Sequence, residues 1–187
     1  MLILASGSPR RMELMEKLHI PFKVEVSGNE EIIPEGIEPK KLPEYLALEK
    51  AKDVFKKHEG EGAVVIGSDT IVLCNGKILG KPHSREEAIE MLKGLSGRTH
   101  EVVTGVGIIS DAGSHSFTDT CEVEFYPLKD EEIERYVDSG EPMDKAGAYG
   151  IQGDGALLVK GIRGDYYTVM GLPVARLYRV LSELKMI

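Results

Sequence analysis

Stretches with the residue spacing of β-strands alternate with stretches that have the spacing of α-helices along the whole chain. Residues 2–5 form a short apolar run. Ser8 and Pro9 then favour a helix start, because serine is a common N-cap and proline suits the first helical turn. An alternating run follows at 21–27, and a stretch with helical spacing follows at 42–58. This order predicts an α/β fold in which helices flank a sheet.

The second half of the chain predicts antiparallel pairing. Residues 62–79 hold two apolar runs, the second of which bends at Asn75-Gly76, a strong hairpin signal. Runs at 100–110 and 115–128 alternate like two more antiparallel strands, and one further strand is expected near 156–160. Helices are expected at 84–97, at 129–140 and after 171–173. The sheet should therefore be mixed and partly antiparallel.

Length and composition exclude several classes of protein. The 187 residues suit one domain over 1–187, or two closely joined lobes. A net charge of −8 argues against a nucleic-acid partner, although a local basic cluster can still bind a small anion. No apolar run approaches the roughly 20 residues that span a bilayer, and no signal peptide is recognised. Cys74 and Cys121 lack metal-ligand spacing, so reduced thiols, a cytoplasmic location and no membrane partner are expected.

A run of small residues precedes two arginines at the start of the first expected helix. Ser6, Gly7 and Ser8 leave room for an anion to approach the backbone, and Arg10 and Arg11 would add charged donors. Solvated arginines on a helix surface are the ordinary alternative. The glycine-rich segment 147–155 has the look of a ligand-shaping loop, although glycine repeats alone are weak signals.

Lys50 lies in an apolar stripe, because steps of four residues connect it with Leu42, Leu46 and Val54. Two interpretations stay open. The stem can pack while the amine reaches water, or the amine can point inward at a charged partner.

Acidic residues supply the remaining candidates. Asp69 follows an apolar strand, where a carboxylate is rare unless it is paired or bound to metal, but where a turn aspartate is also common. Lys81 follows the hairpin and could fold back toward it. Glu30 and Glu31 lie in an irregular loop and are either hard oxygen ligands for a divalent ion or plain solvated charges.

Seven motifs then resemble, in order, the Maf family of nucleoside triphosphate pyrophosphatases, first described as septum-formation inhibitors. They are LASGSPRR, EKA, GSDTIV, GKP, LSGRTHEVVTGV, EPMDKAGAYGIQG and VMGLP, and they cover nearly the whole chain. The family's usual GAD is GSD here. The GIQG motif resembles the subfamily that acts on dTTP and UTP rather than the one that acts on 7-methyl-GTP.

The resemblance implies a hydrolase that cuts a nucleoside triphosphate between its α and β phosphates, with Mg²⁺ or Mn²⁺ as cofactor. It implies the fold of inosine-triphosphate pyrophosphatases, two lobes around a cleft, and a homodimer. Two other functions stay open: a regulatory protein of cell division that senses nucleotides, and a purine house-cleaning pyrophosphatase.

The resemblance also assigns expected roles to individual positions. Asp69 matches the catalytic aspartate, as general base or as metal ligand, and Glu30 or Glu31 would join it at the metal. The same motifs imply that the substrate is selected by Arg10, Thr70 and Gln152. They imply that phosphate is bound by Ser6, Arg11, Lys50 and Lys81.

Overall fold

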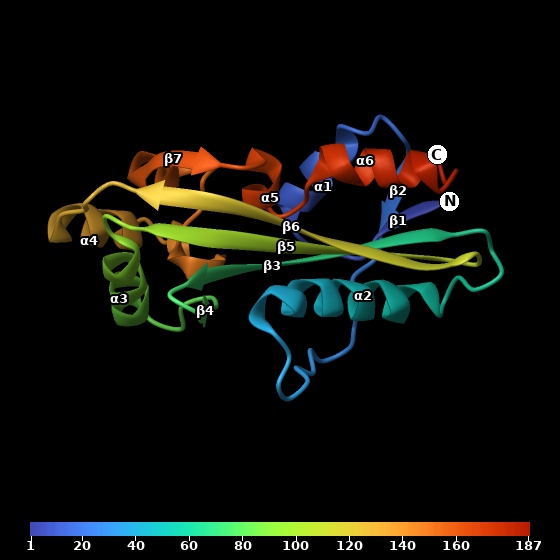
Figure 1. Cartoon of the computed structure of the whole chain (residues 1–187), viewed down its shortest axis with the longest axis horizontal. Helices are drawn as coiled ribbons and strands as arrows, with labels where there is room; N and C mark the ends of the chain where they lie inside the picture. Colours follow the sequence, from blue (N-terminus) through green and yellow to red (C-terminus); the bar gives the residue numbers. More distant parts are fainter. The chain divides into compact units, whose positions relative to one another are not determined.

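A computed structural model describes all residues, 1–187, as seven strands and six α-helices with short 3-10 turns between them (Figure 1). The strands are β1 (Leu2–Leu4), β2 (Phe22–Val24), β3 (Val64–Cys74), β4 (Lys77–Leu79), β5 (Thr99–Ser110), β6 (Gly113–Phe125) and β7 (Val159–Arg163). The helices are α1 (Pro9–Glu16), α2 (Leu42–Phe55), α3 (Arg85–Leu95), α4 (Asp130–Asp138), α5 (Tyr166–Met170) and α6 (Val174–Glu183). None of the helices combines the length and the hydrophobicity that crossing a membrane would require.

The strands form one mixed sheet in the order β2-β1-β3-β5-β6-β7, with β4 paired to β3. β1 pairs in parallel with β2 and β3, whereas β4 runs antiparallel to β3 and β7 antiparallel to β6. The expected α/β class with a partly antiparallel sheet and flanking helices is therefore confirmed.

The chain divides into two compact units. The first, here the N-terminal unit, comprises residues 1–69, 104–119 and 171–187, and the second, here the hairpin unit, comprises residues 70–103 and 120–170. Two lobes were expected; the cleft expected between them stays a prediction.

In the N-terminal unit, α2 lies directly against the sheet because glycines face it. A Cβ atom on Gly67 would lie 2.1 Å from the Ala47 carbonyl oxygen, and one on Gly107 would lie 2.7 Å from the Leu48 Cα. Around this contact the core gathers apolar side chains from β1, α2, β3 and β5, with Ile3, Ala51, Val54, Val65 and Ile109 among them. The position of α2 is thus fixed by backbone contact as well as by packing.

The opposite face of the sheet in this unit carries α1 and α6, as Figure 1 shows. Arg176 of α6 donates a hydrogen bond to the Thr118 carbonyl oxygen at 2.8 Å, and its guanidinium stacks 4.6 Å from the Phe117 ring centroid. The placement of α1 and α2 on opposite faces follows from two right-handed crossovers that run in opposite directions along the sheet, from β1 to β2 through α1 and from β2 past β1 to β3 through α2.

The buried side chains of the hairpin unit include an aromatic cluster. His100, Phe125 and Tyr149 make edge-to-face contacts with ring centroids 4.7–5.4 Å apart. Cys74 and Cys121 are buried free thiols, as expected.

Some sequence expectations are wrong in detail. The strand expected near 156–160 begins at Val159, because residues Asp154–Leu158 form a 3-10 turn. The two runs expected in 62–79 join into the single strand β3 before the Asn75-Gly76 turn, so Asp69 is mid-strand rather than in a turn. Ser8 precedes α1, but its side chain makes no cap; the Ser6 hydroxyl accepts the Ser8 N–H instead, at 3.3 Å.

Candidate functional site

Strand alternation brings Asp69 and Lys50 to the same side of the sheet. Successive side chains of a strand point to opposite faces, so Asp69 shares a face with Val65 and Gly67, which pack against α2. Lys50 is on the buried side of α2, next to Ala47 and Ala51, which lie against Gly67. The close contact between α2 and Gly67 therefore determines the position of Lys50 relative to Asp69.

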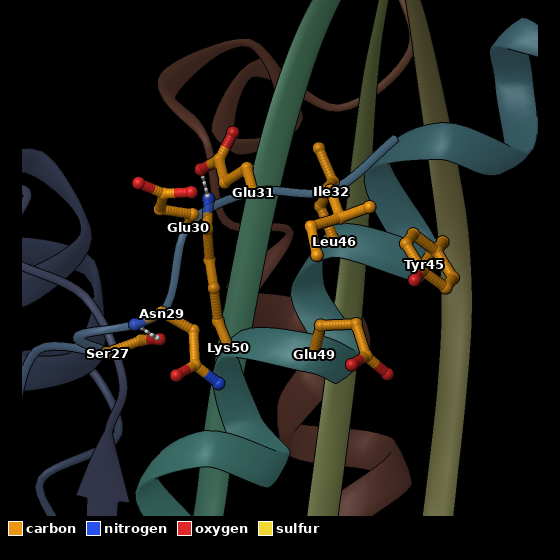
Figure 2. Close-up of a pocket in the computed structure, with 9 residues that line it drawn as sticks. All are labelled: Ser27, Asn29, Glu30, Glu31, Ile32, Tyr45, Leu46, Glu49 and Lys50. Atoms are coloured by element: carbon orange, nitrogen blue, oxygen red, sulfur yellow. Dashed lines mark hydrogen bonds and ion pairs between the residues drawn. The ribbon is translucent and has the colours of Figure 1, made fainter. Parts of the chain in front are cut away.

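The amine of Lys50 forms ion pairs with two carboxylates. Its Nζ lies 2.6 Å from Asp69 Oδ1 and 2.8 Å from Glu31 Oε1, and the side chains of Lys50, Asp69 and Glu31 are 20%, 14% and 54% exposed. Figure 2 shows the Lys50 side chain extending from α2 to the Glu31 carboxylate. Of the two interpretations left open for Lys50, the structure has the inward amine.

The first turn of α1 contributes a second basic group. Arg11 donates from Nε to the Gly171 carbonyl oxygen at 2.9 Å and from a terminal nitrogen to Ser6 Oγ at 3.3 Å. The buried hydroxyl of Ser68 lies 2.8 Å from the Gly171 carbonyl oxygen and 3.1 Å from that of Gly105. Gly171, at the entry to α6, thus holds Arg11 beside the strand that carries Asp69.

Burial and neighbouring charges have opposite effects on the pKa values of Asp69 and Arg11. Burial raises the pKa of Asp69, and the positive charges of Lys50 and Arg11 offset only part of that rise, while Glu31 adds to it. Burial also lowers the pKa of the Arg11 guanidinium, which the negative charge of Asp69 partly restores. A carboxylate poised in this way can accept a proton or hold a cation.

Asp69 and the charged side chains around it lie where α/β proteins commonly bind ligands. In the register of β1 and β3, Leu4 pairs with Ile66, so Asp69 lies just beyond the carboxyl end of β1. The chain leaves β1 toward β2 on one side, while β3 lies on the other side, which makes this a topological switch point.

A pocket of about 400 Å³ opens beside Lys50 within the N-terminal unit. The loop after β2 forms one wall, with Ser27, Asn29, Glu30, Glu31 and Ile32, and α2 forms the other, with Tyr45, Leu46, Glu49 and Lys50 (Figure 2). Glu30 lines this pocket but forms no ion pair with Lys50, unlike Glu31.

Two carboxylates converge, but no complete metal cage is present. No group of three or more His, Cys, Asp or Glu side chains is arranged to hold a metal ion by itself. Oxygens of Asp69 and Glu31 both lie within 2.8 Å of the Lys50 nitrogen. Mg²⁺ commonly takes one or two protein carboxylates and completes its shell with water and substrate phosphates. This donor set therefore fits a divalent ion that arrives with a phosphate ligand.

The remaining sequence candidates belong to the hairpin unit or flank this group. Arg10 lies in the first turn of α1 next to Arg11, and Thr70 follows Asp69 directly in β3. Lys81 is exposed after β4, where the neighbouring Gly80 carbonyl accepts a hydrogen bond from Gly147 N–H at 3.0 Å. Gln152 is exposed in the glycine-rich segment that follows.

Sequence reasoning missed two supporting side chains. In the sequence Ser68 is only a departure from the family's GAD motif, although a hydroxyl in an apolar strand usually has a specific partner. Glu141 gave no signal, because its hydrogen bonds reach a loop more than ten residues further along the chain.

The fold and this group of side chains define an α/β protein with a charged, partly buried site at the carboxyl end of a parallel strand. The model of the family described as Maf-like protein matches residues 1–184, and the chain belongs to the Maf family.

Close relatives cover nearly the full length. A protein from Bacillus velezensis named dTTP/UTP pyrophosphatase is 52% identical over 97% of this chain and 95% of its own length. One from Halalkalibacterium halodurans with the same name is 51% identical over 97% of this chain and 94% of its own. The solved structure of a nucleoside-triphosphatase / dITP/XTP pyrophosphatase from Mycobacterium abscessus aligns with a TM-score of 0.47 and 15% identity, over 98% of this chain and 96% of that one.

Proposed function

We propose that this chain hydrolyses dTTP and UTP to the nucleoside monophosphate and pyrophosphate. The observation that carries the proposal is the meeting of Arg11, Lys50, Asp69 and Glu31 at the carboxyl end of β1. Positive side chains suit phosphates, and a buried carboxylate beside them suits activation of water. The names of the close relatives support the same substrates.

Asp69 is the catalytic residue in this proposal. It takes a proton from the attacking water, or it holds the divalent ion, Mg²⁺ or Mn²⁺, together with Glu31. Such an ion supplies Lewis-acid polarisation of phosphate oxygens and lowers the pKa of water. Glu31 is favoured over Glu30 because Glu31 shares the Lys50 amine with Asp69.

Ser6, Arg11, Lys50 and Lys81 bind phosphate oxygens. Arg11 and Lys50 are already oriented by Gly171 and by the two carboxylates, so little side-chain freedom is lost when the substrate binds. The family's motifs support Lys81 in the same role.

Arg10, Thr70 and Gln152 select the base. The edge of uracil or thymine offers an O4 acceptor beside an N3–H donor, and a glutamine amide offers one donor and one acceptor. Gln152 can therefore meet both groups at once, whereas an ionised glutamate would repel O4.

The cellular setting follows from the family resemblance. We expect a cytoplasmic location and a homodimer. Sedimentation at micromolar protein concentration would test the homodimer by its mass.

The decisive experiment measures the products from a panel of triphosphates with Mg²⁺ or Mn²⁺. We expect UMP or dTMP plus pyrophosphate from UTP or dTTP. Orthophosphate plus a diphosphate would place cleavage at the wrong bond. Binding without turnover would favour nucleotide sensing, and preference for ITP or XTP would favour a purine house-cleaning enzyme.

A further inference from the structure

Glu141 and Tyr136 together tie both ends of the glycine-rich loop in the hairpin unit. Glu141 Oε2 accepts the Asp154 N–H at 2.9 Å, and Oε1 accepts the Gly155 N–H at 3.3 Å. The Tyr136 hydroxyl donates to Oε1 at 2.9 Å and itself accepts the Gly150 N–H at 3.0 Å. Glu141 therefore holds the 154–155 end of the loop directly, and it holds the Gly150 end through Tyr136.

The glycines of this loop let its backbone come close to Glu141 and Tyr136. A Cβ atom on Gly153 would lie 2.4 Å from Glu141 Oε2, and one on Gly155 would lie 2.7 Å from the Tyr136 hydroxyl oxygen. Real Cβ atoms do not come so close to other atoms. This close approach explains the repeated glycines, which are a weak signal in the sequence alone.

Only an ionised carboxylate satisfies all the donors that meet here. The Asp154 N–H, the Gly155 N–H and the Tyr136 O–H all point at Glu141 oxygens. Burial alone would raise the pKa of Glu141, but these hydrogen bonds outweigh it and lower the pKa. A glutamine would present an NH₂ group to one of the donors and leave that donor unpaired.

Gln152 lies in the middle of the tied loop. An amide can pair with uracil, and after a 180° rotation about its last torsion it can pair with cytosine equally well. Discrimination between the two bases therefore requires that the amide keep one position and one orientation, which a mobile loop would not provide.

We propose that Glu141 is a positioning residue for base selection, an inference that rests on the proposed role of Gln152. It holds residues 150–155 so that the Gln152 amide meets uracil or thymine in one orientation only.

The test compares Glu141→Gln, Gln152→Ala and the double variant. The readout is the ratio of kcat/KM for UTP to that for CTP, with kcat and KM reported separately. We expect Glu141→Gln to lower the ratio by about 10-fold or more, as is typical when hydrogen bonds to a charged group are lost. In the Gln152→Ala background the same change should leave the ratio unaltered, because Glu141 acts through Gln152.

Controls separate positioning from loss of folding. Glu131→Gln makes the same chemical change at an exposed position of α4 in the same unit and should leave the ratio unchanged. Tyr136→Phe removes the acceptor of the Gly150 N–H and one donor to Glu141, but it keeps the hydrogen bonds from Asp154 and Gly155 to Glu141, so it should give a smaller loss. Amide hydrogen exchange of residues 150–155 should accelerate in Glu141→Gln while the α4 amides keep their protection.

Three results would overturn the proposal. The first is an unchanged ratio in Glu141→Gln while Gln152→Ala lowers it, which leaves the proposed function intact. The second is an equal loss for UTP and CTP, which indicates general damage. The third is an unchanged ratio in Gln152→Ala, which removes the base-selecting role of Gln152 and with it the role of Glu141.

Discussion

Asp69 takes its character from three neighbours that come from distant parts of the sequence. Lys50 and Arg11 stabilise its charge, whereas burial and Glu31 oppose it, and the net result is a raised pKa. Such a balance suits a group that must give and take a proton or share a cation.

Replacement of Asp69 by Asn should abolish nearly all turnover while the chain stays folded. The amide keeps the shape but can neither accept the proton nor hold the cation. Loss of general-base catalysis alone costs about 10²–10⁴ in rate. Steady-state kinetics with UTP measure the loss of turnover, and circular dichroism checks that the variant is folded. Asp130→Asn, at a largely exposed side chain on α4, is the control; a rate for Asp69→Asn within about threefold of wild type would remove Asp69 from the mechanism.

Lys50→Met should change the pH profile as well as the rate. Loss of a charged contact to phosphate should lower kcat/KM by about 10-fold or more. The positive charge of Lys50 holds the pKa of Asp69 down, so its removal should raise that pKa and move the acid limb of kcat/KM to higher pH. Lys52→Met on the same helix, whose amine pairs only with Glu49, should leave both unchanged. An acid limb that stays in place in Lys50→Met would disconnect Lys50 from Asp69.

At the scale of elements, α2 is held against the sheet by glycines that leave no room for a side chain. The contact is made between backbones, so its accuracy does not depend on flexible rotamers. This is the support that keeps Lys50 in reach of Asp69.

Gly107→Ala should therefore destabilise the fold. Its Cβ would lie 2.7 Å from the Leu48 backbone, so α2 must shift. Overpacking of this kind costs about 1–3 kcal/mol in the free energy of unfolding. Gly161→Ala in β7 is the matched control, because nothing lies within 4 Å of its added atom. Urea denaturation measures both, and equal midpoints would contradict the packing argument.

The aromatic cluster of the hairpin unit should make stability depend on pH through His100. Burial lowers the pKa of His100 to about 4; its Nε2 lies 2.7 Å from the Tyr149 hydroxyl, and its Nδ1 has no partner. As the pH falls, the unfolded chain takes up the proton on His100 before the folded chain does. The contribution of neutral His100 to the free energy of unfolding is therefore present above pH 6.5 and is lost as the pH drops toward 4.

At pH 5 this group alone should cost about 2 kcal/mol of unfolding free energy relative to pH 7. Urea denaturation at the two pH values measures it in wild type and in His100→Gln, which does not titrate. The loss between pH 7 and pH 5 should be smaller in the variant by about that amount. Identical pH dependence in both proteins would show that His100 does not titrate as its burial implies.

For the whole molecule, a net charge of −8 opposes a polyanionic ligand unless cations accompany it. The carboxylates of Asp69 and Glu31 add local repulsion at the site. Metal and nucleotide should therefore bind together more strongly than either does alone.

A UTP analogue with a methylene bridge between its α and β phosphates should stabilise the protein only with Mg²⁺ or Mn²⁺. A ligand at about 100 times its Kd adds about 2.7 kcal/mol to the free energy of unfolding, because it binds the folded state alone. Calorimetry with metal, and with chelator instead, measures the Tm. Equal shifts under both conditions would contradict cooperation between metal and nucleotide.

The sequence predicted most of the fold because the signals were local. The Asn75-Gly76 hairpin lies as expected, with φ values of 51° and 76°. The helix expected at 84–97 is α3, and the Ser84 hydroxyl caps it by accepting the Glu87 N–H at 3.1 Å. The strand expected near 156–160 begins only at Val159, because Asp154–Leu158 form a 3-10 turn whose first two N–H groups bond to Glu141, a residue outside that segment.

By itself, the sequence determined the α/β class, the family and the apolar stripe that contains Lys50, since periodicity and motifs are properties of neighbouring residues. Only the tertiary structure decided that the Lys50 amine turns inward, that Glu31 rather than Glu30 shares it with Asp69, and that Ser68 and Arg11 meet at Gly171. These contacts join residues far apart in the chain. They depend on how closely a helix can approach a sheet, which the glycines permit but no local pattern expresses.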